Sequence, residues 1–149
     1  MLPPDADETS AQLLVRDAGP DDRATALSLL RDAGWTTAQL EAWRSGAPAV
    51  VLYDPANDVT YGVAAVSEDG AGTYSLVGWA VRDLADTTAA GGRVVRAGAD
   101  RARRAGGERL VVTIDDGDPA IHVLIAAGFD VVASLLSQSS GRMTLYLEL

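Results

Sequence analysis

The stretch VRDLADTTAAGG, residues 81–92, joins an apolar strand to a long helix. Before it, residues 74–81 (YSLVGWAV) are almost all apolar, which is typical of a buried strand. The turn-forming sequence EDGAG at residues 68–72 bounds that strand on its other side. After it, residues 93–105 continue a four-residue repeat of small or apolar side chains that begins at Ala90, which predicts a helix.

This junction between strand and helix has two interpretations. The first N–H groups of a helix have no acceptor within the helix, and the helix dipole favours negative charge there. Small side chains let a phosphate approach that backbone, so residues 81–92 fit an anion-binding site. An ordinary loop that opens a helix has the same composition. The residues of the junction alone leave both interpretations open.

Composition bounds the class of protein. The chain has 149 residues, 48% of them hydrophobic, which suffices for one globular domain with a core. Its 12 basic and 21 acidic side chains give a net charge of −9, which argues against nucleic acid as a partner. We find no secretory pattern and no apolar run that could span a bilayer, so we expect no membrane partner. Without cysteine there is no disulfide framework, and we expect a cytoplasmic protein.

The sequence predicts a single domain over residues 13–149, preceded by a loose acidic tail at residues 1–12. Helix-start signals follow the first strand twice, at Pro20 and in the capping box at residues 36–39. The resulting order, β-α-α-β-β-β-α-β-α-β-β, predicts an α/β fold with a mixed central sheet. The predicted strands cover residues 13–16, 49–53, 59–66, 73–81, 109–114, 129–138 and 143–149.

This order resembles that of the GNAT superfamily of acetyl-CoA-dependent N-acyltransferases. In that family a Gln/Arg-x-x-Gly-x-Gly/Ala signature opens the helix after the fourth strand and cradles the pyrophosphate of the cofactor. Val81 and the helix end at residues 100–106 both place this signature on residues 86–91. A second family segment, Asn-x-x-Ala-x-x-Leu-Tyr-x-x-x-Gly-Phe, falls on residues 117–129 and ends in the matching Gly128-Phe129. The resemblance implies a GNAT-like fold over nearly the whole chain after the tail.

The resemblance also implies acetyl-CoA or CoA as cosubstrate. Backbone groups near Trp79 and Ala80 would orient the thioester, and the loop that follows would hold the pyrophosphate. Two positions depart from the signature, since Asp86 replaces Gln or Arg and Ala89 replaces the first Gly. A carboxylate repels a pyrophosphate, so we expect Asp86 to turn outward or to cap the helix. The implied cofactor-binding residues are Trp79, Ala80, Val81, Asp86, Thr87, Thr88, Ala89, Ala90, Gly91 and Gly92.

Candidate catalytic residues follow from the same resemblance. Asp115 and Asp116 come after an apolar strand, near the opening that receives the substrate in this family. Either is a candidate general base for the attacking amine, although an acid pair after a strand is also typical of a solvated turn. Tyr74 and Ser75 on the fourth strand are the other polar candidates near that opening.

The usual proton donor of the family is missing. Leu124 stands where many members carry a Tyr that protonates the leaving thiolate, and a leucine has no proton to give. His122 is two residues away, which on a helix means roughly the opposite face. The spacing of acidic residues and His122 predicts no metal site.

Two functional hypotheses remain from the sequence. The first is an acetyl-CoA-dependent N-acetyltransferase in which a small amine or amino-acid-like substrate attacks the thioester directly. The net charge of −9 favours cationic acceptors. The second is a GNAT-like domain that has lost acyl transfer and serves as a binding or regulatory protein, or catalyses other chemistry in the same cleft. Asp86 and Leu124 motivate the second hypothesis. A homodimer through the last strands is a further expectation from the resemblance.

Overall fold

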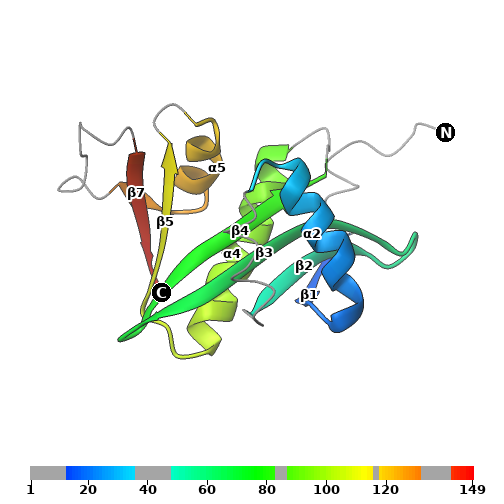
Figure 1. The fold of residues 1–149 in the computed structure, drawn as a ribbon, viewed down its shortest axis with the longest axis horizontal. Coiled ribbons are helices and arrows are strands. Elements are labelled where there is room, and N and C mark those ends of the chain that lie inside the picture. The colour runs from blue at the N-terminus through cyan, green and yellow to red at the C-terminus, as the bar shows by residue number, and fades with distance from the viewer. Residues whose placement is uncertain (1–12, 36–47, 83–86, 116–117, 132–141) are drawn as a thin grey trace.

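A seven-stranded mixed sheet in the order β1-β2-β3-β4-β5-β7-β6 organises the molecule (Figure 1). The computed structural model describes residues 13–35, 48–82, 87–115, 118–131 and 142–149. Neighbouring strands in this sheet are antiparallel, except for β4 and β5, which run parallel. The mixed α/β fold that the sequence predicts is therefore confirmed. The strands are β1 (Leu14–Asp17), β2 (Ala49–Asp54), β3 (Val59–Gly70), β4 (Thr73–Val81), β5 (Arg109–Asp115), β6 (Asp130–Val131) and β7 (Arg142–Glu148).

Helices cover both faces of the sheet (Figure 1). One face carries the 3-10 helix η1 (Pro20–Asp22) and α2 (Arg23–Asp32), and the other carries α4 (Thr87–Arg104) and α5 (Ala120–Ala126). Apolar side chains meet the sheet from both sides, and their burial is the main source of stability. None of the described helices is long and apolar enough to cross a membrane.

Two separate cores fill the spaces between sheet and helices. On the α2 side, Ala26 and Leu30 pack with Ala80 of β4. On the other side, Val94 of α4 and Leu124 of α5 belong to a larger cluster with strand residues. The members of this larger cluster that are fully buried include Leu52, Val66, Leu110, Phe129 and Leu145.

Several predicted boundaries change. α4 begins at Thr87, earlier than the predicted residue 93, because the small side chains before Arg93 are helical rather than loop. β3 extends to Gly70, beyond the predicted residue 66. The predicted helix at residues 36–44, and most of the predicted strand at residues 129–138, lie outside the described residues. At the start of α5, Asp118 Oδ1 accepts the N–H of Ala120 at 2.9 Å.

Candidate functional site

β4 and β5 pair over only part of their length in the described sheet. Their parallel partners are Thr73 with Arg109, Tyr74 with Leu110, and Ser75 with Val111. Beyond these positions β4 runs on to Val81 and β5 to Asp115, and Figure 1 shows the two strands diverging. We call residues 73–75 and 109–111 the closed end of this pair, and residues 76–81 and 112–115 the open end. At the open end the facing backbone edges do not pair with each other.

A β-bulge marks the start of the open end. Leu76 pairs with Val66 of β3 and Gly78 pairs with Ala65, so Val77 is the extra residue on β4. The bulge shifts the alternation of side chains between the two faces of the sheet. Leu76 packs on the α4 side, whereas a Cβ on Gly78, two residues later, would lie 3.0 Å from Leu30 of α2. Bulges bend and twist a strand, which explains why β4 leaves β5 here. A glycine inside the strand is the one sequence signal for this feature.

At the open end, the Trp35 side chain, just after α2, binds the backbone edge of β4 that faces β5. The Arg82 N–H donates to the Tyr61 carbonyl of β3 at 2.7 Å. Backbone groups of a strand alternate between its two edges, so the N–H and C=O of Trp79 point toward the β5 side. The Trp35 indole N–H donates to the Trp79 carbonyl at 2.8 Å. One acceptor on the open edge is therefore already used.

The chain turn after α2 aims Trp35 at β4. Gly34 has φ +93°, a left-handed conformation that ends the helix. The next N–H, that of Trp35, then donates back to the Leu30 carbonyl at 3.1 Å. The sequence does not predict this contact. No local signal could reveal it, since Trp79 is far away along the chain.

The start of α4 lies against Trp79. A Cβ on Gly91 would approach Val123 of α5 to 3.0 Å and the Trp79 ring to 3.1 Å, so the missing side chain permits this packing. A Cβ on Gly92 would meet only the guanidinium of Arg96, at 3.7 Å. The structure thus brings together the predicted cofactor residues Trp79, Gly91 and Gly92.

The structure describes only some of the other predicted cofactor residues. Val81 is half-buried against the α4-side core, and Ala80 is buried on the α2 side. Ala90 is buried in the first turns of α4, which carry no acidic residue. Asp86 lies outside the described residues, as do the side chains of Thr87, Thr88 and Ala89. Their roles stay predictions.

Of the catalytic candidates, Asp115 is placed at the open end. It is exposed at the last position of β5, opposite Arg142 of β7. Tyr74 lies at the closed end instead, 6% exposed, and its hydroxyl donates to the Ala105 carbonyl at 3.5 Å. The Ser75 hydroxyl bonds to Asp69. Tyr74 therefore packs at the far end of β4 from Trp79, and Asp116 lies outside the described residues.

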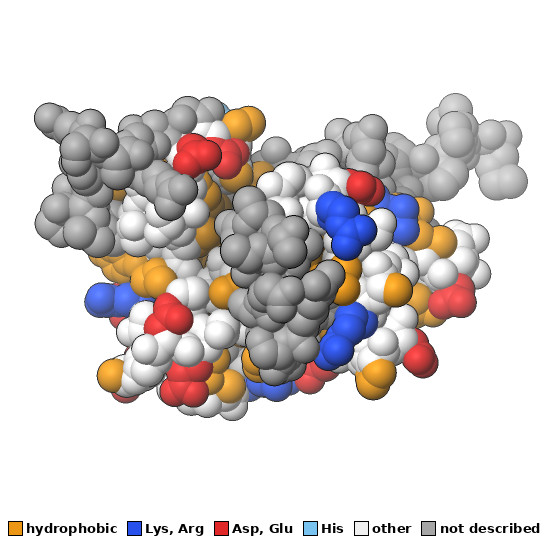
Figure 2. All heavy atoms as spheres, in the orientation of Figure 1, with side chains coloured by type: hydrophobic (Ala, Val, Ile, Leu, Met, Phe, Trp, Pro, Cys, Tyr) orange, Lys and Arg blue, Asp and Glu red, His pale blue; other side chains and the backbone are white. Residues whose placement is uncertain are grey.

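The α5 candidates lie as the sequence predicts. Leu124 is fully buried in the larger core, whereas His122 is exposed on the opposite side of the helix. Neither side chain is a proton donor toward the core side of α5. Within the described residues, no group of three His, Asp or Glu side chains is arranged to hold a metal ion. Figure 2 shows basic as well as acidic side chains on the face that carries α2.

The chain was compared with known proteins. No protein-family model matches its sequence, and a search of curated proteins gives no significant match. Solved structures do match. An acetyltransferase from Bacillus subtilis in complex with CoA has a TM-score of 0.73 at 15% identity, covering 92% of this chain and 99% of its own.

Two further structures have the same arrangement. An IAA acetyltransferase from Bacillus cereus has a TM-score of 0.73 at 17% identity, covering 92% of this chain and 99% of its own. A GNAT family acetyltransferase from Elizabethkingia anophelis with acetyl-CoA bound has a TM-score of 0.71 at 13% identity, covering 93% and 99%. At identities this low, the structural likeness establishes the fold alone. The overall arrangement of sheet and helices is thus that of the GNAT acetyltransferase fold.

Proposed function

We propose that this protein is an acetyl-CoA-dependent N-acetyltransferase for a small amine or amino-acid-like substrate. The observation that carries the proposal is the open end of the β4–β5 pair, with the start of α4 packed against Trp79. Two of the structural neighbours were solved with CoA or acetyl-CoA bound. A cytoplasmic location and a homodimer remain predictions.

The described residues fit such a cosubstrate. Trp79 and Val81 direct backbone groups away from β3, toward the open end, where an extended amide-bearing chain finds donors and acceptors. The Trp79 carbonyl already accepts a hydrogen bond from Trp35, whereas the Trp79 N–H faces the open end as a donor. The first turn of α4 itself carries no acidic residue, although Asp86 directly precedes it, and the first N–H groups of a helix favour a phosphate. The close contact between Gly91 and the Trp79 ring fixes the position of α4 relative to β4.

Each part of the proposed reaction is assigned to residues of this chain. Acetyl-CoA, when bound, supplies an activated acyl group. The Trp79 N–H would orient a carbonyl at the open end, and Trp35 would hold that backbone edge in place. Asp115, exposed at the end of β5, would take the proton from the amine, directly or through water. With Leu124 buried, water would return a proton to the leaving group.

Calorimetric titration with CoA and acetyl-CoA, followed by thiol release with a panel of amines, tests the proposal. Saturable binding and amine-dependent thiol release are expected. Thr88→Glu adds a negative charge to the first turn of α4, and should weaken CoA about tenfold or more while leaving the melting temperature unchanged or raised. Ser28→Glu, on exposed α2 surface, is the matched control and should change neither. Absence of binding at millimolar CoA would refute the proposal.

One observation favours the second candidate, a GNAT-like domain without acyl transfer. Leu124 is 0% exposed inside the core, so the usual position of the proton donor is part of the packing. This candidate predicts that CoA binds but that no amine in the panel releases thiol. Turnover by the wild-type chain would exclude this candidate, whereas CoA binding with no thiol release from any amine would support it.

A further inference from the structure

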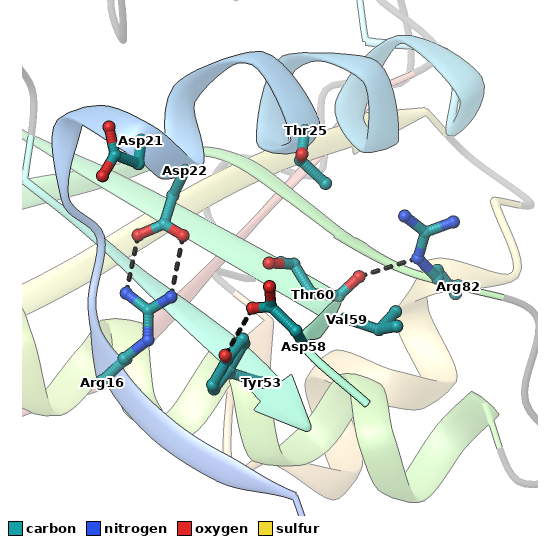
Figure 3. Close-up of a pocket in the computed structure, with 9 residues that line it drawn as sticks. All are labelled: Arg16, Asp21, Asp22, Thr25, Tyr53, Asp58, Val59, Thr60 and Arg82. Carbon is teal, nitrogen blue, oxygen red and sulfur yellow. Dashed lines mark hydrogen bonds and ion pairs between the residues drawn. The ribbon is translucent and has the colours of Figure 1, made fainter. Parts of the chain in front are cut away.

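A second, polar pocket lies between α2 and the turn that joins β2 to β3 (Figure 3). Its volume is about 500 Å³, within the range of small-molecule sites. All but one of its lining residues are polar or charged, which suits a small charged ligand and not an apolar one. The lining residues are Arg16, Asp21, Asp22, Thr25, Tyr53, Asp58, Val59, Thr60 and Arg82.

Arg16 and Asp22 form a fixed wall of this pocket. The Arg16 guanidinium donates to both carboxylate oxygens of Asp22, at 2.7 and 2.9 Å, and lies 4.5 Å from the centre of the Tyr53 ring. The Gly19 N–H donates to the same carboxylate at 2.7 Å. The Arg16 hydrogen bonds hold the pKa of Asp22 below its usual value. These two charges satisfy each other, so neither is the group that a ligand would recognise.

Arg82 offers a guanidinium that is anchored but unpaired in the described part of the chain. Its backbone N–H binds the Tyr61 carbonyl at 2.7 Å, and its Nε donates to the Thr60 carbonyl at 2.7 Å. No described residue contributes a hydrogen bond or ion pair to its two terminal nitrogens. Figure 3 shows this side chain at the opposite end of the pocket from the Arg16–Asp22 pair. An anchored guanidinium of this kind suits a carboxylate.

Asp58 presents a carboxylate from the β2–β3 turn. Asp54, itself buried, accepts the N–H of Ala56 at 2.9 Å and the side-chain amide of Asn57 at 2.7 Å, which fixes the turn. Asp58 follows with φ +54° and accepts the Tyr53 hydroxyl at 2.6 Å. A carboxylate accepts several hydrogen bonds, so Asp58 retains capacity for an ammonium group.

The buried hydroxyl of Thr60 points to an occupant. Thr60 is 8% exposed and lines the pocket, yet its hydroxyl has no hydrogen-bond partner among the described residues. Buried polar groups in proteins are nearly always hydrogen-bonded. A polar ligand in the pocket would satisfy this hydroxyl.

We propose that this pocket binds a small zwitterion of the amino-acid class. The ligand carboxylate pairs with the Arg82 guanidinium, its ammonium group with Asp58, and the Thr60 hydroxyl bonds between them. The site lies on the α2 side of the sheet, where Leu30 packs on Gly78 and Ala80 is buried, whereas the side chains of Trp79 and Val81 pack on the α4 side. The proposal therefore does not depend on acyl transfer.

Amide chemical-shift titration without CoA tests this site. The probes are glycine, L-alanine, L-glutamate and L-lysine at up to about 10 mM, with acetate and methylamine as the two separate halves of a zwitterion. At least one amino acid should bind saturably, with shifts at residues 58–60 and 82, and about tenfold more tightly than either half. The amides of residues 78–80 should shift less.

Two variants test the assigned roles. Arg82→Gln and Asp58→Asn should each weaken the binding about tenfold, and Asn keeps the left-handed conformation that position 58 requires. Arg23→Gln, on exposed α2 surface outside the pocket, is the control and should leave the affinity unchanged. Failure of all four amino acids to bind, equal binding of acetate, or unchanged affinity in both variants would overturn the proposal.

Discussion

The two ends of β4 contrast sharply although one strand forms both. At the closed end Tyr74 is buried, its ring lies where a Cβ on Gly107 would come, and β5 pairs alongside. At the open end, beyond the Val77 bulge, β5 has parted and Trp79 accepts a hydrogen bond from the Trp35 side chain. Each end holds an aromatic residue, and each has one side-chain donor bonded to a backbone carbonyl.

In this contrast backbone pairing, and not residue type, separates a position inside the complete sheet from one beside the gap. Tyr74 carries a hydroxyl suited to acid–base chemistry, yet it lies where the sheet is complete and the hydroxyl is bonded to the end of α4. Trp79 carries no such group, but its backbone faces the gap in the sheet. We therefore expect substitutions at the closed end to change stability, and substitutions at the open end to change binding as well.

The largest effect is expected at Gly107, at the closed end. A Cβ there would lie 2.7 Å from the Tyr74 ring and 2.9 Å from the Ala102 carbonyl oxygen, so Gly107→Ala must displace backbone or a buried ring. Urea denaturation should show the free energy of unfolding lowered by about 2 to 3 kcal/mol. Gly92→Ala, with room for its Cβ, should not be destabilised and serves as the control. A Gly107→Ala protein as stable as the wild type would contradict the packing described at this end.

Trp35→Phe tests the open end and should have an intermediate effect. The substitution keeps an aromatic ring but removes the donor to the Trp79 carbonyl, which should cost about 1 kcal/mol of unfolding free energy. Because the open edge becomes less ordered before binding, CoA affinity should fall about threefold. Denaturation and calorimetry measure the two effects separately. Unchanged CoA affinity would show that Trp35 has no role beyond packing.

Tyr74→Phe is the matched variant and should have the smallest effect. It also removes a single donor to a backbone carbonyl, but the bond is 3.5 Å long and lies at the closed end. The free energy of unfolding should change by less than about 0.5 kcal/mol, because so long a bond contributes little. CoA affinity and any turnover should be unchanged within error. A large loss of turnover with normal stability would support Tyr74 as a catalytic residue.

The sequence predicted the elements of this fold well. The apolar run at 73–81 gave β4 with its observed bounds, and the repeat around Val94 gave α4, although its start was placed too late. Periodicity reports which face of an element is buried, which was enough to place Leu124 and His122 on opposite sides of α5. These properties are local, so a single sequence contains them.

What the sequence missed depends on contacts between distant segments. The Trp35–Trp79 hydrogen bond joins α2's end to β4, and the pocket around Arg82 and Asp58 draws on three separate stretches of chain. Tyr74 stays a predicted catalytic residue, but the extent of strand pairing places it at the closed end, and no residue pattern reports that extent. Gly78 is the sequence feature that indicates the bulge in β4, since a glycine within a strand often marks one.

Backbone amide chemical shifts on addition of CoA test the central claim most directly, because they report the two ends of β4 in one experiment. We expect large shifts at residues 78–81 and 87–92, smaller shifts at residues 112–115, and none at residues 73–75. Shifts concentrated at residues 73–75, or CoA binding that leaves residues 78–81 and 87–92 unchanged, would contradict the assignment of the open end as the acyl-donor site.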